Sequence, residues 1–437
     1  MQIKQQIKQQ IKRERYLQNL IDRMHNGMVK VVTGVRRCGK TYLLFNIFGD
    51  YLRSQGVDDA HVIELALDDE RNAKYRNATA LATHLHSLVA NKHEMYYLLL
   101  DEVQFAITDE ELKDTSMPPK LYGVLNGLLR LRNVDIYVTG SNSKMLSSDI
   151  MTEFRGRGDE VRVRPFSFSE FMYGFNGDIY QGWAEYVVFG GMPLTMMMRT
   201  DEQKSRYLEN LFTETYLKDI IARNRLAKTR EFEDLTNVLA SNIGALTNPT
   251  KLEATFNSVL HMKISANTIN TYIGYLKEAF IVEEARRFNV KGRKYIGSPV
   301  KYYFEDVGLR NARLGFRQIE QTHIMENIIY NELRTRGYSV DVGEVEKRGK
   351  KEGKDYRAFL EVDFVANIGS NRCYIQSAYA LPTEEKVKQE KASLLNINDS
   401  FNKIILVHDM VKPTRDTHGI LTMSVFDFLL NPGSLSM

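Results

Sequence analysis

Cysteine is scarce in this chain, which has only two among its 437 residues. Cys38 and Cys373 are too few to build a disulfide framework, and such usage is typical of a reducing compartment. No window approaches the run of about 18 apolar residues that a membrane span requires. The Gln- and Lys-rich start also lacks the apolar centre of a signal peptide. We therefore expect a cytoplasmic protein with no membrane-embedded part.

The excess of positive charge is small as well. Lysine and arginine number 59 against 55 acidic residues, which leaves a net charge of +4. That value is too low to indicate nucleic-acid binding by itself, so such a function must rest on local clusters. With 43% hydrophobic and 26% charged residues and only 9 prolines, the composition is that of an ordinary folded protein. The length predicts about two to four domains.

The most informative motif spans residues 34–41 and matches the phosphate-binding pattern G-x-x-x-x-G-K-[ST]. An apolar stretch at 29–33 predicts a strand before it, and residues 42–48 predict a helix after it. Glycines let the backbone curl around phosphates, and the helix start attracts the anion. In this pattern Lys40 reaches the β- and γ-phosphates, and Thr41 ligates Mg²⁺. The residues expected to bind ATP are Gly34, Val35, Arg36, Arg37, Cys38, Gly39, Lys40, Thr41 and Tyr42.

Two adjacent carboxylates, Asp101 and Glu102, end the apolar run at 96–100. In P-loop ATPases of the additional-strand class, the first acid supports Mg²⁺ and the second polarises the water that attacks the γ-phosphate. Solvated acids at a strand end are the ordinary alternative. Downstream of a phosphate-binding loop, we expect Asp101 to hold the metal and Glu102 to activate water. The sequence thus predicts an ATPase that uses ATP and Mg²⁺.

A third group of candidates follows the apolar run at 136–139. In this ATPase class the strand beside the metal-holding strand carries a polar sensor of the γ-phosphate, and Ser141 or Asn142 fits that role. A turn rich in Ser and Asn is the alternative. Arg157 is a candidate for stabilising transition-state charge, in cis or across a subunit contact. It could equally pair with a surface acid such as Asp159.

Apolar runs and helical stretches alternate along the first part of the chain. Such alternation predicts an α/β core with a parallel sheet and helices on both faces. With the phosphate-binding loop and the adjacent acids, this core is typical of a P-loop NTPase of the additional-strand class. The expected strands are 29–33, 61–67, 96–100, 136–139 and 161–163, and the expected helices include 42–48, 80–91 and 120–130. Further on, three helical stretches and a hairpin occur in the order of a winged helix-turn-helix, and a small α+β domain follows.

Pattern changes suggest five parts. They are an amphipathic helix at 1–26, the ATPase core at 27–165, a helical subdomain at 166–228, the winged helix at 229–315 and a C-terminal domain at 316–437.

A basic cluster lies on the hairpin of the predicted winged helix, with no acid between Arg286 and Phe304. It comprises Arg286, Arg287, Lys291, Arg293, Lys294 and Lys301, with Tyr295 and Tyr302 interleaved. Such a hairpin can lie along a phosphate backbone beside a helix in the major groove. We expect contact with double-stranded DNA, and the alternative is a protein-interaction module with a solvated basic turn. A second basic stretch, 347–357, is interrupted by acids and glycine and is predicted to be a surface loop.

Short motifs are spread over most of the chain. They are Val-Thr-Gly-Val-Arg-Arg-Cys-Gly-Lys-Thr at 32–41, Leu-Leu-Leu-Asp-Glu-Val-Gln at 98–104, Thr-Gly-Ser-Asn-Ser at 139–143, Gly-Arg at 156–157, Pro-Phe-Ser-Phe-Ser-Glu-Phe at 165–171, Gly-Gly-Met-Pro at 190–193, Lys-Tyr-Tyr-Phe-Glu-Asp-Val-Gly-Leu-Arg at 301–310 and Leu-Glu-Val-Asp-Phe at 360–364. Together they resemble the prokaryotic AAA-type P-loop ATPases that carry a C-terminal domain of unknown function. The resemblance implies an ATPase core, a winged-helix segment and a C-terminal fold like that of restriction nucleases. It implies no known cellular task.

Nucleases of that fold bind Mg²⁺ with a helical Glu, an Asp on a strand and a Glu-x-Lys on the next strand. Glu326 or Glu332 fits the first position and Asp363 the second, but the third reads Gln-Ser-Ala at 376–378. A carboxylate and the catalytic lysine are both missing. The resemblance therefore implies a degenerate PD-(D/E)XK fold without nuclease activity, used for binding or scaffolding.

The sequence thus predicts an ATPase whose hydrolysis drives a conformational switch, with DNA as the leading partner. The main alternative is a regulatory or scaffold protein whose winged helix and C-terminal domain bind other proteins. A small-molecule kinase is a third reading, but the adjacent Asp101 and Glu102 favour water as the acceptor. Self-association is compatible with the sequence.

Overall fold

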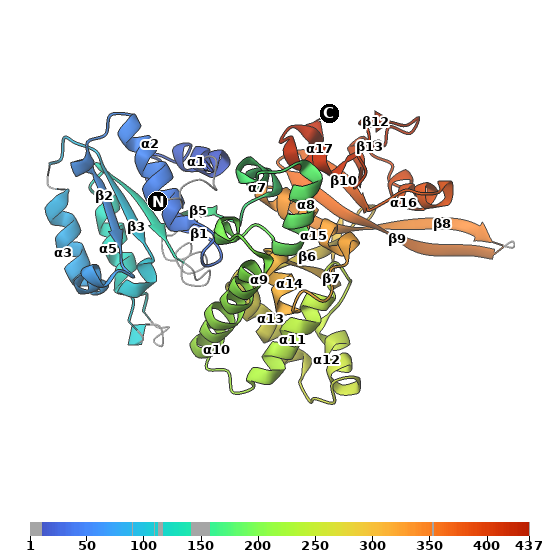
Figure 1. Ribbon diagram of the computed structural model, residues 1–437, viewed down its shortest axis with the longest axis horizontal. Coiled ribbons are helices and arrows are strands. Elements are labelled where there is room, and N and C mark those ends of the chain that lie inside the picture. The colour runs from blue at the N-terminus through green and yellow to red at the C-terminus, as the bar shows by residue number, and fades with distance from the viewer. Residues whose placement is uncertain are drawn as a thin grey trace. The chain divides into compact units, whose positions relative to one another are not determined.

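The structure of the protein is a computed structural model that describes residues 11–89, 91–108, 110–111, 117–140, 158–351 and 354–436 (Figure 1). The described chain divides into two compact units. The N-terminal unit comprises residues 11–165 with 278–280, and the C-terminal unit comprises 166–277 with 281–436. In the part of the chain that is described, no helix has the length and apolar character needed to cross a membrane.

The N-terminal unit is built on a five-stranded sheet in the order β2-β3-β4-β1-β5, with every neighbouring pair parallel. The strands are β1 (Val29–Thr33), β2 (Val62–Ala66), β3 (Tyr96–Asp101), β4 (Val134–Thr139) and β5 (Gly158–Arg162). β1, β3 and β4 are buried at every position, as expected of strands covered on both faces. Since β4 is inserted between β1 and β3, the sheet confirms the predicted additional-strand class.

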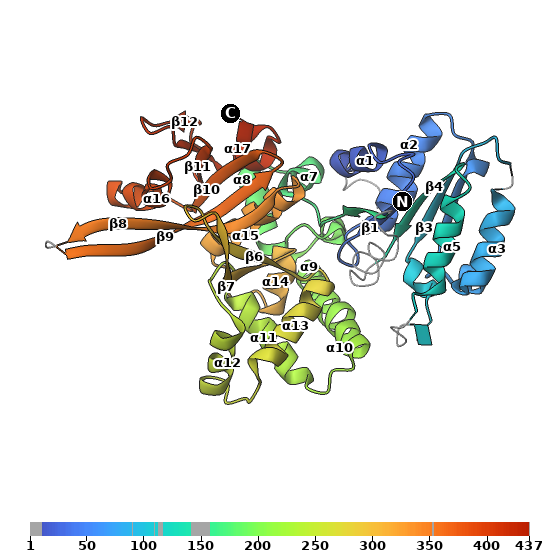
Figure 2. The same ribbon diagram turned by 180° about the vertical axis from the view of Figure 1, so that it is seen from behind.

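Helices cover both faces of this sheet (Figures 1 and 2). They are α1 (Glu14–Ile21), a π-helical segment (Tyr42–Phe48) continued by α2 (Gly49–Ser54), α3 (Ala78–Leu88) and α5 (Lys120–Leu129), with short 3-10 helices at Asp59–His61, Glu70–Arg76 and Val103–Ala106. Leucines of α3 and α5 pack in one apolar cluster with Leu98 and Ile136 of the sheet. On the opposite face the ring of Phe48 lies 4.6 Å from that of Tyr137.

The predicted strands and helices of this unit occur within a few residues of their expected positions. The first helix is shorter than predicted. α1 ends at Ile21, and residues 22–28 form turns and bends that lead into β1. Residues 1–10 of the predicted helix lie outside the described residues.

The C-terminal unit combines helices with an eight-stranded mixed sheet in the order β12-β13-β11-β10-β9-β8-β6-β7. The strands are β6 (Val282–Asn289), β7 (Lys294–Phe304), β8 (Ser339–Lys351), β9 (Lys354–Ile368), β10 (Asn371–Ala378), β11 (Asn402–Val407), β12 (Thr414–Arg415) and β13 (Leu421–Ser424). The helices are α7 (Phe168–Gly174), α8 (Ile179–Phe189), α9 (Asp201–Asn210), a π-helical segment (Leu211–Leu217), α10 (Lys218–Asn224), α11 (Thr229–Ser241), α12 (Pro249–Ser258), α13 (Ala266–Glu278), α14 (Val307–Arg313), α15 (Gln321–Thr335), α16 (Glu384–Leu395) and α17 (Val425–Leu430), with 3-10 turns at Pro193–Met197 and Ser434–Ser436. Three helices and a hairpin, α11 to β7, thus occur in the predicted order.

The boundary expected at residue 315 does not separate two sheets. β6 pairs in parallel with β8, from Arg287 opposite Val342 to Asn289 opposite Glu344. Because of this pairing, the hairpin predicted to be a wing is continuous with the strands of the C-terminal region. The regions 166–228, 229–315 (apart from 278–280) and 316–436 accordingly belong to one compact unit.

The prediction of a surface loop at 347–357 is wrong for the described residues, because 347–351 and 354–357 belong to two long paired strands. β8 and β9 pair from Ser339 opposite Asn367 to Lys351 opposite Lys354. The glycine in this stretch does not break the ribbon. Gly349 is opposite Tyr356, and a Cβ at Gly349 would lie 2.6 Å from Cε1 of the tyrosine ring. The ring therefore covers the glycine and supplies the cross-strand contact that the missing side chain cannot.

The Gly-Gly-Met-Pro motif has a structural explanation in the C-terminal unit. Asp306 is almost fully buried, and its carboxylate accepts the backbone N–H of Gly191 at 2.7 Å and that of Leu309 at 2.9 Å. Gly190 has a φ of +68°, and a Cβ there would lie 2.3 Å from Oδ1 of Asp306. Burial raises the pKa of Asp306 to about 6, although the backbone N–H donors oppose that shift. The two glycines thus let the chain wrap closely around one buried carboxyl group that also caps α14.

We expect Gly190→Ala to lower the free energy of unfolding of the C-terminal unit by about 2–4 kcal/mol, because it adds a left-handed residue and a steric clash. The single tryptophan, Trp183, is 4% exposed on α8 and reports unfolding of this unit by its fluorescence. The matched control is Gly274→Ala in α13, where a Cβ meets nothing within 4 Å. It should raise stability by up to about 1 kcal/mol. Equal urea midpoints for the two variants would contradict the prediction.

Candidate nucleotide-binding site

The phosphate-binding loop connects β1 to the π-helical segment. Gly34 and Gly39 have φ values of +139° and +97°, which favour glycine, and Arg37 is also left-handed at +62°. A Cβ at Gly34 would lie 2.0 Å from the carbonyl oxygen of Val163. The glycine is thus required both by its backbone conformation and by the close approach of the chain after β5. Val35 and Cys38 are buried beneath the loop, whereas Tyr42 is exposed beside it.

Lys40 lies on the inner side of this loop. Its side chain is 4% exposed, and its ammonium group donates to the carbonyl oxygens of Gly34 at 3.0 Å and Val35 at 3.2 Å. Backbone carbonyls are weaker partners for an ammonium than phosphate oxygens, because they carry no net charge. The side chain is therefore placed to transfer from the loop carbonyls to the phosphates of a nucleotide.

Asp101 connects the loop to the neighbouring strands. Its carboxylate accepts hydrogen bonds from the Thr41 hydroxyl at 2.7 Å and from the Thr139 hydroxyl at the end of β4. Asp101 is 2% exposed, and burial raises the pKa of its carboxyl group, although the two hydroxyls oppose the shift. A hydroxyl and a carboxylate are hard oxygen ligands of the kind that Mg²⁺ prefers. Thr41 and Asp101 therefore fit a magnesium ion bound together with a nucleotide.

Glu102 follows β3 with a left-handed φ of +50°. Its backbone N–H donates to the Thr139 hydroxyl at 3.1 Å, and its carboxylate accepts a hydrogen bond from the Gln104 amide. Asp101, predicted to hold the metal, and Glu102, predicted to activate water, are thus linked through Thr139. This placement suits Glu102 to orient and polarise a water molecule.

Thr139 is a site residue that the sequence reasoning did not assign. The signal was present, because it is the first polar side chain after the apolar run of β4. The predicted sensors, Ser141 and Asn142, and the predicted Arg157 lie outside the described residues, so their roles stay predictions.

Arg13 is a second residue that the motifs did not indicate. It is 3% exposed, and its guanidinium donates to the carbonyl oxygens of Cys38 at 2.9 Å and Arg164 at 2.7 Å. It thereby ties the loop to the chain that follows β5. On the same side, the Cys38 thiol lies 3.4 Å from the carbonyl oxygen of Val163. No local pattern marks Arg13, because its partners are 25 and 151 residues away along the chain.

The basic residues predicted to contact DNA do not form one free surface. Arg287 pairs with Glu344 of β8, and Arg286 pairs with Glu284 at 3.2 Å. The Lys291 ammonium donates to the carbonyl oxygen of Glu346 at 2.6 Å. Arg293 and Lys294 are exposed. Arg287 therefore links β6 to β8 within the sheet, and the hairpin has fewer cations available to contact DNA than its sequence suggests.

Lys301 departs most from the predicted basic cluster, because it is 3% exposed and lies among carboxylates. Its ammonium lies 2.7 Å from Glu361, 2.9 Å from Glu326 and 3.8 Å from Asp363. The Tyr303 hydroxyl also donates to Glu326 at 2.6 Å. Burial alone would lower the pKa of Lys301, but the three carboxylates together raise it above its ordinary value.

The fold thus brings Glu326 and Asp363 together, as the nuclease resemblance implies, around a lysine instead of a metal. The other candidate, Glu332, pairs with Arg336 at 2.7 Å and lies outside this group. Asp363 also accepts the backbone N–H of Ser377 at 2.8 Å. In the described part of the chain, no group of three or more His, Cys, Asp or Glu side chains is arranged to hold a metal ion.

Comparison with known proteins agrees with the phosphate-binding loop and parallel sheet described above. Residues 26–172 match the family model of an AAA domain, and residues 180–320 match that of a domain of unknown function (DUF8612). Together with the parallel sheet, the first match defines the class: the chain carries an AAA-type P-loop ATPase domain. The chain belongs to the same family as an uncharacterized protein of Haemophilus influenzae, to which it is 31% identical over 423 residues, 96% of this chain and 98% of that protein. An uncharacterized protein of Methanocaldococcus jannaschii is 27% identical over 387 residues, 85% and 79% of the two chains.

The comparison with solved structures also gave matches. The Aeropyrum pernix ORC1 protein in complex with DNA is 15% identical, with 69% of this chain and 91% of that chain covered and a TM-score of 0.28. A DNA polymerase III gamma subunit-related protein from Thermotoga maritima is 12% identical, with 60% and 99% covered and a TM-score of 0.29. With TM-scores below 0.5, these likenesses carry no conclusion about function.

We expect Arg13→Ala to raise the KM for ATP by about 10-fold or more, because two charge-assisted hydrogen bonds that position the loop are lost. The effect on kcat should be smaller, since the two hydrogen bonds of Arg13 go to backbone carbonyl oxygens of Cys38 and Arg164. The matched control, Lys12→Ala, removes an exposed cation next to it and should leave both constants unchanged. Steady-state ATPase kinetics decide the matter, and an unchanged KM in the Arg13 variant would refute the positioning role.

A second prediction concerns pH. Burial and the nearby Glu326 raise the pKa of Asp363 to about 7, although Lys301 opposes the shift. The folded state therefore favours the neutral acid, and stability is lost as pH rises from the unfolded pKa of about 4 through about 7. Asp363→Asn should remove up to about 3 kcal/mol of that loss between pH 5 and pH 8. Urea unfolding followed by Trp183 fluorescence measures it, with the exposed Glu385→Gln as control. Parallel pH profiles for wild type and Asp363→Asn would contradict it.

Proposed function

We propose that the protein hydrolyses ATP with Mg²⁺ and that hydrolysis drives a conformational switch in a DNA-associated process. The observation that carries this proposal is the hydrogen-bonded chain from Thr41 through Asp101 to Thr139. The Thr41 hydroxyl, a buried carboxylate and the polar end of β4 thus lie beside the loop that holds Lys40, which supports a bound Mg²⁺.

Each residue has a distinct task in this reaction. The loop N–H groups and Lys40 bind the phosphates, and Thr41 with Asp101 holds Mg²⁺. Magnesium would neutralise charge on the phosphates. Glu102 accepts a hydrogen bond from the attacking water, and Thr139 fixes the backbone from which Glu102 extends. The adjacent carboxylates of Asp101 and Glu102 suit water as the acceptor of the γ-phosphoryl group, which favours hydrolysis over a small-molecule kinase.

The DNA part of the proposal rests on the exposed end of the β6-β7 hairpin, where Arg293 and Lys294 face solvent. A partner protein is the alternative for the same surface. DNA cleavage by the C-terminal unit is disfavoured, because Lys301 lies among the carboxylates where a metal ion would be needed and Gln376 replaces an acid.

We expect Glu102→Gln to lower ATP turnover by about 100-fold or more while ATP binding is kept, because the amide cannot accept the proton of the attacking water. Lys40→Ala should instead weaken ATP binding by about 10-fold or more, since a charge-assisted contact to phosphate is lost. The control, Glu70→Gln, removes a carboxylate that is 83% exposed and should match wild type. Turnover and nucleotide binding are measured on the full chain.

The same assay is run with and without a panel of double- and single-stranded DNA and RNA. Turnover that rises with duplex DNA supports the DNA-associated version. An absence of turnover under every condition, or a Glu102→Gln variant as active as wild type, would refute the ATPase proposal.

A further inference from the structure

The distal part of the β8-β9 ribbon forms an arm that extends from the C-terminal sheet (Figures 1 and 2). β6 pairs with β8 only up to Glu344, and β10 pairs with β9 only up to Phe364. Beyond these residues, towards Lys351 and Lys354, the two strands pair only with each other. An isolated two-stranded ribbon is marginally stable in water. Val345 and Val362 still pack in the core, but beyond them none of the described side chains of the ribbon is buried.

Two arginines face each other across this arm. Arg348 is directly opposite Arg357, and their side chains are 80% and 58% exposed. Like charges in this position destabilise a ribbon. Glu346 partly compensates, because its carboxylate pairs with Arg348 and, at 2.9 Å, with Arg357. The two guanidinium groups share one ion-paired carboxylate, and Asp355 lines the hollow beside them. An anion in contact with both guanidinium groups would relieve their repulsion.

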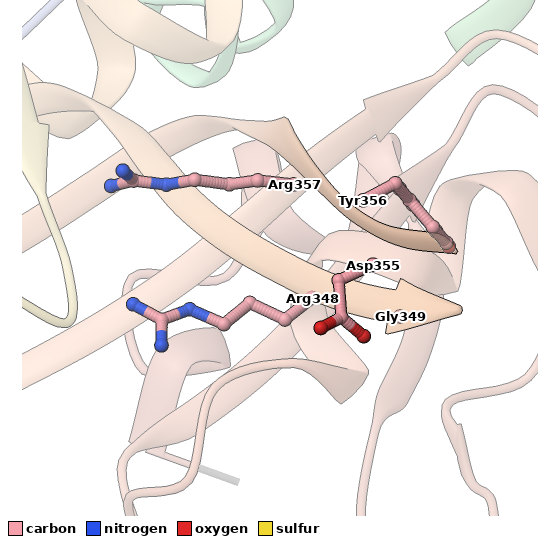
Figure 3. A pocket seen from close by; sticks show the side chains of 5 residues that line it. All are labelled: Arg348, Gly349, Asp355, Tyr356 and Arg357. Atoms are coloured by element: carbon pink, nitrogen blue, oxygen red, sulfur yellow. The ribbon is translucent and has the colours of Figure 1, made fainter. Parts of the chain in front are cut away.

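The surroundings of the arginine pair have the form of a shallow binding surface. A hollow of about 540 Å³ is lined by Arg348, Gly349, Asp355, Tyr356 and Arg357. Figure 3 shows both guanidinium groups extending in the same direction from the ribbon. Tyr356 and Phe359 are 39% and 51% exposed, and the Arg357 guanidinium lies 4.9 Å from the centre of the Phe359 ring. These exposed rings are flat surfaces beside the cations.

The sequence of the arm adds to its positive charge. Residues 346–357 contain six basic residues and three acidic ones, a balance of +3 over one short segment. That is most of the chain's formal net charge of +4. Such local concentration is the signature of an anionic partner, which the charge of the whole chain does not reveal.

The base of the arm adjoins the hairpin to which the proposed function assigns DNA contact. Glu344 pairs with Arg287 of β6, and the Lys291 ammonium donates to the carbonyl oxygen of Glu346 at 2.6 Å. Glu344, Glu346 and Arg348 alternate along β8 and so lie on one face. The cations of the hairpin and those of the arm thus belong to neighbouring strands of a single sheet.

We propose that the distal β8-β9 arm binds the sugar-phosphate backbone of double-stranded DNA, with Arg348 and Arg357 contacting phosphates. This inference rests on the DNA association in the proposed function and names a second contact for it. A two-stranded ribbon has the width that the major groove of DNA admits. Duplex phosphates provide the regularly repeated anions that two parallel guanidinium groups can contact.

The test measures the binding of a mixed-sequence DNA duplex to the full chain. Binding is monitored by fluorescence anisotropy over a range of salt concentrations. Arg348→Gln/Arg357→Gln removes both charges without adding acids beside Glu346. We expect affinity to fall at least 10-fold at low salt, and the slope of log affinity against log salt to decrease by about 2, one for each lost phosphate contact. The control is Arg71→Gln/Arg206→Gln, which removes two arginines that are 88% and 72% exposed elsewhere. It should bind as wild type does.

Other outcomes separate this inference from the proposed function. An arm variant with unchanged affinity and salt slope overturns the arm, and loss of binding in Arg293→Gln/Lys294→Gln would then leave the hairpin as the DNA contact. Tighter binding of single-stranded DNA or of polyglutamate, lost in the arm variant, also overturns the duplex assignment. If wild type binds no nucleic acid, both DNA claims fail, while ATP turnover still tests the ATPase separately. ATP turnover without DNA should be the same in wild type and the arm variant.

Discussion

The buried carboxylate of Asp101 is the contact on which the arrangement of the nucleotide site depends. It joins the end of β3 to the loop after β1 and to the end of β4. The strand order makes this possible, because β4 lies between the other two strands and brings Thr139 within reach. Glu102 is attached to the same threonine through its backbone, so the two acids cannot change position independently.

The C-terminal unit has its own buried charges, and they are handled differently. Asp306 is surrounded by backbone N–H groups and keeps the chain at Gly190 and Gly191 close to α14. Glu326 and Asp363 share the ammonium of Lys301 with Glu361. Removing Lys301 from this group is costly, because the carboxylates around it are left without compensation.

The sequence predicted the parts that depend on local pattern. The phosphate-binding loop, the strand ending in Asp101 and the fold class follow from residues that are neighbours in the chain. Arg13 was missed because its contacts are distant along the chain and no periodicity reports them. Lys301 is assigned to the wrong group for the same reason: it follows the basic run from Arg286 to Lys294 with no acid between them, while its spatial partners come from α15 and β9. The stretch around Gly349 was read as a loop, because a glycine covered by a tyrosine ring from the opposite strand cannot be recognised from composition.

The continuity of the C-terminal sheet has a mechanical consequence. Adjacent strands are held about 4.8 Å apart by their ladder of hydrogen bonds, so the hairpin β6-β7 and the base of the arm cannot slide or rotate against each other without breaking that ladder. The conformational switch proposed above would therefore move both segments together without changing the spacing between them.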